Sequence, residues 1–232
     1  AGKSMKKFSS LFDKKNKKTF IIAEIGNNHE GSLKLAKKLI TQAKKCGVDA
    51  VKFQTFIPEL FVSEEDKKRF LQLKKFQLTF KEFSILSKFA KKLGLHFFST
   101  PLDLESAKFL NKIQKFFKIA SSDNDFYPLI ELVSSFNKTL MISTGLANIK
   151  TINRAKKIVL QTWKKQKKRN RKLILMHCVS NYPVESHEAN LMAILTLKKK
   201  FKECLIGYSD HTVGNVAALS AVALGAKVIE KH

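Results

Sequence analysis

The chain has 232 residues, 44% of them hydrophobic, and its 44 Lys and Arg outnumber 19 Asp and Glu, for a formal net charge of +25 at pH 7. This length is enough for one large domain with a substantial core. The apolar runs are the length of strands, so we expect no helix that spans a membrane. The basic segment 1–19 has no apolar stretch that would make it a secretory signal, and residues 1–4 are typical of a tag remnant.

The excess of lysine favours an anionic small molecule over a nucleic acid as the partner. The lysines are spread over the whole chain, mostly as Lys-Lys pairs, and few aromatic residues stand among them. A nucleic-acid interface would need a basic face with aromatic side chains for stacking. A positive field would instead attract an anionic substrate. The three cysteines have no metal-ligand spacing, which favours reduced thiols in a cytoplasmic protein.

Short runs of β-branched and aromatic residues alternate along the chain with amphipathic helical patterns. The eight strand-like runs are residues 20–26, 50–56, 96–103, 116–123, 139–145, 172–180, 204–211 and 227–232. The clearest helical patterns are residues 32–47, 80–94 and 215–226. In the first of these, Ser32 is suited to cap the start of the helix and Gly47 its end. The longest irregular connection, residues 57–79, is charged, and we expect it to be partly helical over 63–76.

The alternation of strands and helices predicts an α/β fold whose parallel strands are joined by right-handed crossovers. Eight such strands suit a closed (β/α)8 barrel, the TIM barrel, better than an open doubly wound sheet. No Gly-x-Gly-x-x-Gly pattern follows the first strand, which argues against a dinucleotide-binding sheet. We therefore expect one barrel over residues 20–232, preceded by the basic segment 1–19.

Polar and ionisable residues gather at the C-terminal ends of almost all predicted strands, where barrel enzymes place their active sites. Lys52 and Lys118 stand out because apolar neighbours flank both of them inside their strands. A buried ammonium group is costly without an anionic partner. The favoured interpretation is that both lysines bind a phosphate or carboxylate of a ligand. The alternative is that they form structural ion pairs with Glu24, Glu230 or an aspartate.

Two of the six histidines, His211 and His232, stand at the ends of adjacent predicted strands. Imidazoles on neighbouring strand ends can share one divalent ion whose other positions hold water or substrate oxygens. Such an open site is catalytic, because structural sites are closed. Spacing alone supports this metal site no better than it supports two unrelated histidines. His177 lies within a strand and is suited to the core, and the basic run 164–172 is expected at the opposite end of the barrel.

The strand ends also carry a series of motifs in a fixed order. These are AEIGNNHEGS, VKFQTF, FSTPLD, FKIASSD, ISTG, HCVSNYP, GYSDHT and IEKH. Together they closely resemble the sialic acid synthase family, the nonulosonate synthases, which include the legionaminate and pseudaminate synthases. The resemblance covers residues 20–232. One STG motif would carry no information, but eight ordered motifs at eight strand ends are specific.

The resemblance implies a transferase that condenses phosphoenolpyruvate with an N-acetylated hexose, either N-acetylmannosamine or a 2,4-diacetamido-6-deoxyhexose. The product would be a nine-carbon 2-keto sugar acid, formed with release of phosphate by C–O cleavage. Members of the family combine a (β/α)8 barrel with a small antifreeze-like domain and commonly form homodimers. They also need a divalent metal ion, for which Mn2+ is our first expectation and Mg2+ or Co2+ are alternatives.

Carried over position by position, the resemblance assigns roles to residues of this chain. Glu24 matches an active-site carboxylate, and His211 and His232 match the metal ligands. The positions that hold phosphoenolpyruvate are matched by Lys52, Lys118, Ser143, Ser180 and Ser209, with Thr100 near its carboxylate. The sugar-contacting positions are matched by Gln54 and Tyr182, and Ser121 is a further substrate-binding candidate. We take Glu24, Lys52 and Lys118 as the catalytic residues.

The chain departs from the family pattern after His232, where a closing helix and the antifreeze-like domain would follow. We therefore expect a barrel truncated after its eighth strand, with an incomplete sugar site. Two alternatives stay open at this point. The chain could be another phosphoenolpyruvate-dependent synthase of 3-deoxy sugar acids, or a truncated barrel that binds a ligand without turnover.

Overall fold

The structure is a computed structural model that describes Phe12 and residues 18–166 and 171–232. Its eight strands are β1 Phe20–Gly26, β2 Ala50–Thr55, β3 His96–Pro101, β4 Phe116–Ile119, β5 Thr139–Ser143, β6 Leu173–Cys178, β7 Leu205–Asp210 and β8 Val228–Lys231. Each strand lies within a run that the sequence predicted. The expected tag remnant, most of segment 1–19 and the middle of the basic run 164–172 lie outside the described residues.

The strands form one parallel sheet in the order β3-β2-β1-β8-β7-β6-β5-β4. Every ladder in it is parallel, as the strand–helix alternation predicted. The sheet curls until its edge strands β3 and β4 contact each other, although no ladder joins them within the described residues. The predicted (β/α)8 barrel is thus confirmed as a nearly closed barrel with one seam.

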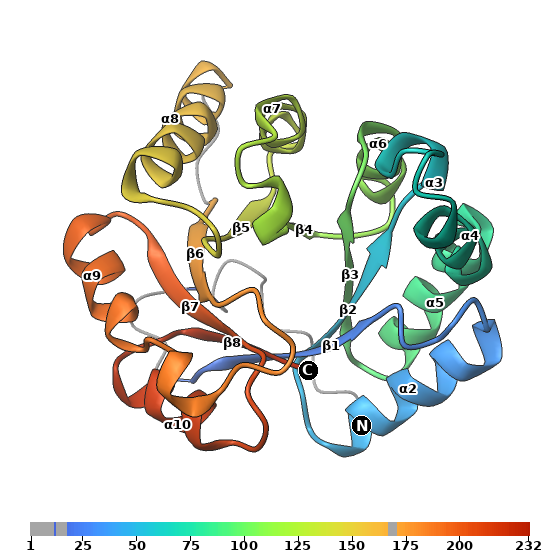
Figure 1. The fold of residues 1–232 in the computed structure, drawn as a ribbon, viewed down its shortest axis with the longest axis horizontal. Coiled ribbons are helices and arrows are strands. Elements are labelled where there is room, and N and C mark those ends of the chain that lie inside the picture. Colours follow the sequence, from blue (N-terminus) through green and yellow to red (C-terminus); the bar gives the residue numbers. More distant parts are fainter. Residues whose placement is uncertain (1–11, 13–17, 167–170) are drawn as a thin grey trace.

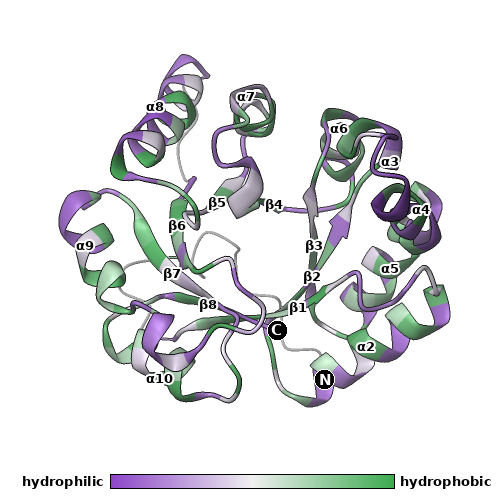
Figure 2. Ribbon diagram, in the orientation of Figure 1, coloured by the Kyte–Doolittle hydropathy of each residue, from purple (hydrophilic) through white to green (hydrophobic). Residues whose placement is uncertain are grey.

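The helices surround the strands on the outside of the barrel (Figure 1). They are α2 Leu33–Lys45, α3 Pro58–Phe61, α4 Lys67–Phe76, α5 Phe80–Lys92, α6 Leu104–Leu110, α7 Tyr127–Ser135, α8 Ile149–Lys165, α9 Met192–Lys200 and α10 Val216–Ala223. Hydrophobic and hydrophilic residues alternate along α2 and α8, which places a hydrophobic stripe against the strands (Figure 2). In the described ranges, none of these helices has the length and apolarity needed to cross a membrane.

The helix ends follow the capping chemistry of the sequence. Ser32 caps α2 as predicted, since its side chain accepts a hydrogen bond from the Leu35 amide. At the other end the prediction is wrong by one position: Cys46 is the cap residue, and Gly47 follows it with φ +77°. A left-handed residue directly after the cap is where glycine is favoured. Asp66 caps α4, which confirms that the connection 57–79 is partly helical.

The barrel interior changes from apolar to polar along the strands. Residues on the inward face include Ile22, Ala50, Phe98, Phe116, Met141, Met176, Gly207 and Val228, all buried. Side chains in a strand alternate between faces with a period of two. Two residues further on, the same face therefore carries Glu24, Lys52, Thr100, Lys118, Ser143, Cys178, Ser209 and Glu230. This polar layer forms the floor of the barrel mouth.

Aromatic rings close the other end of the barrel. Phe20 and Phe116 are the first residues of β1 and β4, and the buried ring of Phe12 lies against both. The ring centroid of Phe12 is 5.1 Å from that of Phe20 and 6.4 Å from that of Phe116. The barrel is therefore a packed core that opens at the C-terminal ends of its strands.

Candidate active site

One cavity of about 370 Å³ opens at the barrel mouth. All twelve residues that the sequence nominated line it: Glu24, Lys52, Gln54, Thr100, Lys118, Ser121, Ser143, Ser180, Tyr182, Ser209, His211 and His232. They come together because parallel strands end at the same edge of a sheet and the polar residues stand at those ends. A larger cavity of about 560 Å³ lies between β6, α8 and α9 and shares Leu146, Cys178 and Ser180 with the mouth.

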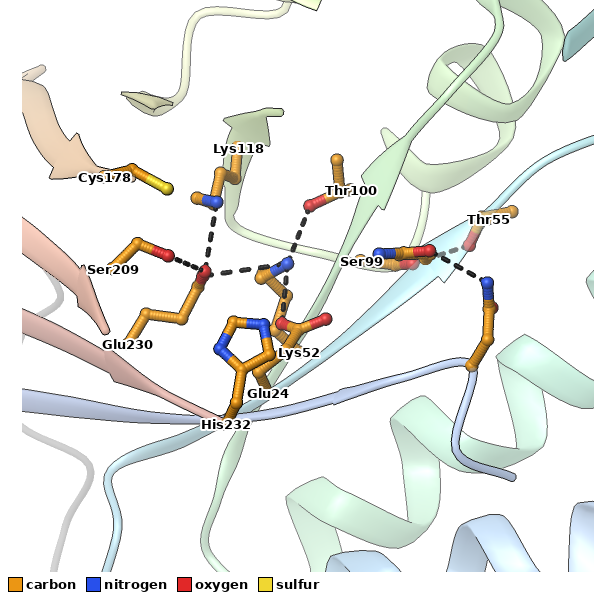
Figure 3. A network of polar contacts seen from close by, with 12 residues as sticks. Glu24, Lys52, Thr55, Ser99, Thr100, Lys118, Cys178, Ser209, Glu230 and His232 are labelled. Atoms are coloured by element: carbon orange, nitrogen blue, oxygen red, sulfur yellow. Dashed lines mark hydrogen bonds and ion pairs between the residues drawn. The ribbon is translucent and has the colours of Figure 1, made fainter. Parts of the chain in front are cut away.

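Two lysines and two glutamates form a buried network on the floor of the mouth (Figure 3). Lys52 Nζ lies 2.6 Å from Glu24 Oε2 and 3.6 Å from Glu230 Oε2. Lys118 Nζ donates to Glu230 Oε1 at 3.1 Å, and Ser209 Oγ donates to the same oxygen at 2.7 Å. Figure 3 shows these three donors pointing toward Glu230, with Glu24 beside Lys52. Lys52 also donates to Thr100 Oγ1 at 3.1 Å.

The two carboxylates of this network have opposite pKa shifts. Burial raises the pKa of Glu24 to about 7, and the charge of Glu230 adds to this against the opposing effect of Lys52. Burial also acts to raise the pKa of Glu230, but Lys118, Lys52 and the Ser209 hydroxyl overcome it and lower that pKa to about 2. Pairs of titratable groups whose environments separate their pKa values are typical of acid–base sites.

The lysine contacts bear on the two interpretations that the sequence left open. The structure shows the ion pairs of Lys52 and Lys118 with Glu24 and Glu230. Both ammonium groups nevertheless line the mouth cavity, so a ligand that enters it reaches them. Anion binding by the same lysines stays a prediction.

Three buried hydroxyl groups lie in the mouth, and two of them are close to Gly145, the residue that follows β5 by two positions. The Oγ atoms of Ser121, Ser143 and Ser180 are buried and lack a hydrogen-bond partner within the described part of the chain. A Cβ atom on Gly145 would come within 2.6 Å of Ser180 Oγ and 2.7 Å of Ser121 Oγ. The absence of a side chain at Gly145 thus leaves room for two of these hydroxyls. Buried polar groups without partners are costly, so these hydroxyls are available to bind water or a ligand that enters the mouth.

His211 and His232 contact each other at the mouth, with ring centroids 4.4 Å apart and planes at 84°. Burial lowers the pKa of both imidazoles, that of His232 to about 4, so both are neutral near pH 7. His232 Nδ1 lies 3.2 Å from the Asp210 carbonyl oxygen, and donating to it leaves the Nε2 lone pair free. Among the described residues, no group of three or more His, Cys, Asp or Glu has the arrangement of a metal site. Two adjacent imidazoles that are neutral near pH 7 fit an open two-histidine site.

The residues assigned to the sugar lie nearer the rim. Tyr182 is 68% exposed and its ring stacks on His211 at a centroid distance of 4.0 Å. Gln54 Oε1 accepts a hydrogen bond from Asn27 Nδ2 at 2.9 Å. The exposed position of Tyr182, directly over a histidine of the pair, leaves its ring available to a second ligand.

Two further histidines, His177 and His96, lie away from this pair. His177 is buried, stacks on Tyr208 and bonds the Ala189 carbonyl through Nε2 at 2.9 Å, as suits a core histidine. His96 begins β3 at the end away from the mouth.

Comparison with known proteins identifies the relatives of this barrel. The model of the NeuB family matches residues 39–232. The chain belongs to the NeuB family. It is 46% identical over 220 residues to an uncharacterized protein of Methanocaldococcus jannaschii, covering 94% of this chain and 63% of that one. It is 42% identical over 230 residues to the N,N'-diacetyllegionaminic acid synthase of Campylobacter jejuni, covering 93% of this chain and 67% of that one.

Solved structures agree with this NeuB family assignment. The N-acetylneuraminic acid synthetase of Leptospira borgpetersenii, solved with citrate, superimposes with a TM-score of 0.84 at 37% identity, over 93% of this chain and 73% of that one. A 3-deoxy-D-arabino-heptulosonate 7-phosphate synthase of Thermotoga maritima has a TM-score of 0.65 at 15% identity, which shows the shared fold alone. The chain spans 63–67% of the length of the two curated relatives named above.

Sequence reasoning assigned no role to several residues that line this NeuB family site, among them Cys178 and Arg69. It named Glu230 only as a candidate ion-pair partner of Lys52 and Lys118, which the structure bears out. Glu230 accepts from Lys118 and Ser209, Cys178 lies 3.8 Å from His211 Nε2, and Arg69 lines the mouth from α4. The period of two along a strand marks Cys178, two residues after inward-facing Met176, and Glu230, two residues before His232. No local signal marks Arg69.

Proposed function

We propose that this chain carries the catalytic barrel of a nonulosonate synthase. The reaction would condense phosphoenolpyruvate with an N-acylated hexose to a nine-carbon 2-keto sugar acid and release phosphate. The observation that carries the proposal is the convergence, in one NeuB family mouth, of two buried lysines, three unpartnered hydroxyls and two neutral histidines. Relatives that are named as synthases of diacetyllegionaminic, pseudaminic and N-acetylneuraminic-type acids support it.

Phosphoenolpyruvate carries a phosphate and a carboxylate, and the floor of the mouth offers donors suited to both. Lys52 and Lys118 supply charge-assisted hydrogen bonds, and the free hydroxyls of Ser121, Ser143 and Ser180 supply neutral ones. An incoming anion would compete with Glu230 for Lys118. The ion pairs thus orient both ammonium groups before the ligand arrives.

In the proposed chemistry, C3 of phosphoenolpyruvate attacks the aldehyde carbon of the open-chain sugar. The aldehyde oxygen takes up a proton, and C2 becomes an oxocarbenium ion that water captures. The resulting tetrahedral carbon expels phosphate by C–O cleavage and becomes the 2-keto group. Glu24, whose pKa is raised to about 7, can gain or lose a proton near neutral pH, which suits a role toward the attacking water.

The metal part of the proposal rests on His211 and His232. We expect them to hold a divalent ion because both imidazoles are neutral and adjacent. The family resemblance implies that this ion is Mn2+, with Mg2+ or Co2+ as alternatives. When bound there, the ion would supply Lewis-acid polarisation of the aldehyde oxygen. Glu230 accepts bonds from Lys118 and Ser209, so the chain itself offers the ion mainly nitrogen ligands and leaves positions for oxygen atoms of water or substrate.

A cytoplasmic location and a homodimer belong to the same proposal. Cys46 and Cys178 are free thiols, which suits a reducing compartment. The homodimer rests on the family resemblance. A synthase of 3-deoxy sugar acids has only fold-level support, from structures at 15% identity. The second alternative is a barrel that binds a ligand without turnover, and a phosphate-release assay distinguishes it from an active synthase.

The test combines binding with turnover. Calorimetry should detect phosphoenolpyruvate binding to the chain, and Lys118→Ala should weaken it roughly 10- to 150-fold, the loss of about 1.5–3 kcal/mol for a hydrogen bond to a charged group. Phosphate release is then measured with Mn2+ and a panel of N-acylated hexoses. The proposal would be refuted if the wild-type chain did not bind phosphoenolpyruvate, or if Lys118→Ala bound it as tightly as the wild type. Binding without phosphate release for any sugar would favour the non-catalytic alternative.

A further inference from the structure

A short helical hairpin, α3 and α4, forms one wall of the mouth. Phe61 of α3 and Arg69 and Leu73 of α4 all line the mouth cavity. The hairpin is anchored by Leu73, which packs with Phe56 and Leu102 in a small apolar cluster. Phe56 directly follows β2 and Leu102 directly follows β3, so the hairpin is fixed over the ends of these two strands.

This wall is separated from the histidine pair around the mouth. In the ring of strands, β3 is four positions from β7, which ends just before His211, and three positions from β8, which ends just before His232. β2 is four positions from β6, which leads to Tyr182. A sugar whose aldehyde lies near His211 and His232 would therefore extend its far end toward α3 and α4.

Arg69 differs from the other cations of the mouth. Lys52 and Lys118 are paired with Glu24 and Glu230, whereas Arg69 forms no salt bridge with any described residue. Its guanidinium lies over the ring of Phe61, 5.6 Å from the centroid. That contact orients the group while its N–H donors stay free.

Neighbouring residues hold the contact between Arg69 and Phe61 in place. The ring of Phe61 packs on buried Phe56 with a centroid distance of 5.9 Å. The Arg69 amide donates to the Asp66 side chain at the start of α4. An ion pair between Lys74 and Glu59 joins the two helices. Arg69 is thus a preorganised donor on an otherwise apolar wall.

One guanidinium beside Phe61, Leu73 and Leu102 matches an acylamido group. Such a group presents one strong acceptor, its carbonyl oxygen, and one small apolar methyl group. A phosphate would call for several converging donors, as on the floor of the mouth. The described lining of this wall offers a single cation among apolar side chains.

We infer that the α3–α4 wall binds a second acylamido substituent at the far end of the hexose, with Arg69 donating to its carbonyl oxygen. This inference rests on the proposed function, because it concerns the second substrate of that site. It makes Arg69 a specificity-determining residue for diacylamido hexoses over hexoses with a single acylamido group next to the aldehyde.

The test uses reduced sugars, the alditols, which keep every substituent but lack the reactive aldehyde. Three are titrated into the chain with phosphoenolpyruvate and Mn2+ present: a 2,4-diacetamido-6-deoxyhexitol, N-acetylmannosaminitol and its 6-phosphate. Arg69→Gln should weaken the diacetamido alditol by about 10-fold or more, the loss of one charge-assisted bond, and leave N-acetylmannosaminitol unchanged. Lys68→Gln, which removes an equal charge from the neighbouring position outside the cavity lining, should change neither.

The other possible results of these titrations distinguish failure of the inference about Arg69 from failure of the proposed synthase function. Equal losses for both unphosphorylated alditols, no loss for either, or no alditol binding at all would overturn the role of Arg69. A loss confined to the 6-phosphate would overturn it in favour of a phosphate subsite. Failure of the wild-type chain to bind phosphoenolpyruvate would instead refute the proposed function.

Discussion

Replacing Glu230 with glutamine is expected to destabilise the fold and at the same time to tighten anion binding at the mouth. Glu230 is 1% exposed, accepts from Ser209 and Lys118 at 2.7 and 3.1 Å, and lies 3.6 Å from Lys52. Glutamine keeps the shape of the side chain and an acceptor oxygen. It removes the negative charge that stands between two buried ammonium groups.

The magnitude follows from these distances. At an effective dielectric constant of about 20, opposite charges 3.1 Å apart attract by about 5 kcal/mol. Breaking a buried ion pair on one side costs about 3–5 kcal/mol. Because the amide oxygen still accepts from Lys118, we expect the lower end, about 3 kcal/mol. For a domain of this size that lowers Tm by about 6–12 °C.

The effect on anions has the opposite sign. A charge about 6 Å from an incoming phosphate repels it by about 3 kcal/mol at the same dielectric constant. Removing the charge of Glu230 should therefore strengthen the binding of inorganic phosphate by at least about tenfold. The loss of stability and the gain in affinity have one electrostatic cause.

Thermal unfolding followed by circular dichroism at pH 7 and calorimetry with inorganic phosphate measure the two effects. Glu203→Gln is the matched control, because Glu203 pairs with Lys156 at 2.6 Å on the surface, where such pairs contribute about 0–1 kcal/mol. A Glu230→Gln variant that melts like the control and binds phosphate no better than the wild type would refute this account of the network.

Three further outcomes are expected. The folded pKa of Glu24, about 7, exceeds its ordinary value of 4.5, so between pH 4.5 and pH 7 the native state binds more protons at this group than the unfolded chain does. The contribution of Glu24 to stability should therefore fall as pH rises from 5 to about 7.5, whereas that of His29 and His232, whose pKa values burial lowers to about 4, rises over the lower part of the same range. Glu24→Gln should make the stability measured by urea unfolding increase more with pH than in the wild type, and an unchanged pH dependence would contradict the assignment. Gly145→Ala, whose Cβ would approach two serine hydroxyls within 2.7 Å, should weaken phosphoenolpyruvate about tenfold or more in calorimetry; full affinity would disprove the hydroxyl site. His211→Ala should abolish tight Mn2+ binding measured by electron paramagnetic resonance, whereas exposed His187→Ala should not, and equal affinities would exclude the site.

Much of the fold was predictable because each strand is a buried run flanked by turn residues. The polar residues at the strand ends were predictable for the same reason. Lys52 and Lys118, for example, interrupt apolar runs at the position where the inward face becomes polar. The neighbouring places of His211 and His232 followed from counting strands, which the β7–β8 ladder confirms.

The details that escaped prediction depend on contacts between distant segments, so the sequence could offer Glu230 only as one of several possible partners of the two lysines. Glu230 accepts from Lys118, which lies 112 residues earlier, and from Ser209, its register partner across the β7–β8 ladder. Arg69 is one of three consecutive basic residues, and nothing local separates it from Lys67 and Lys68. Its place at the mouth depends on how α4 packs over the strand ends, which the sequence pattern does not specify.

The ring of Phe12, at the end of the barrel away from the mouth, bears on the order in which ligands bind at the mouth. Since Phe12, Phe20 and Phe116 close that end, reactants and products must pass through the same opening. The lysines that would hold phosphoenolpyruvate are almost fully buried, whereas Tyr182 stands exposed at the rim. In the proposed reaction phosphoenolpyruvate must then load before the sugar, and a sugar that arrives first would act as an inhibitor.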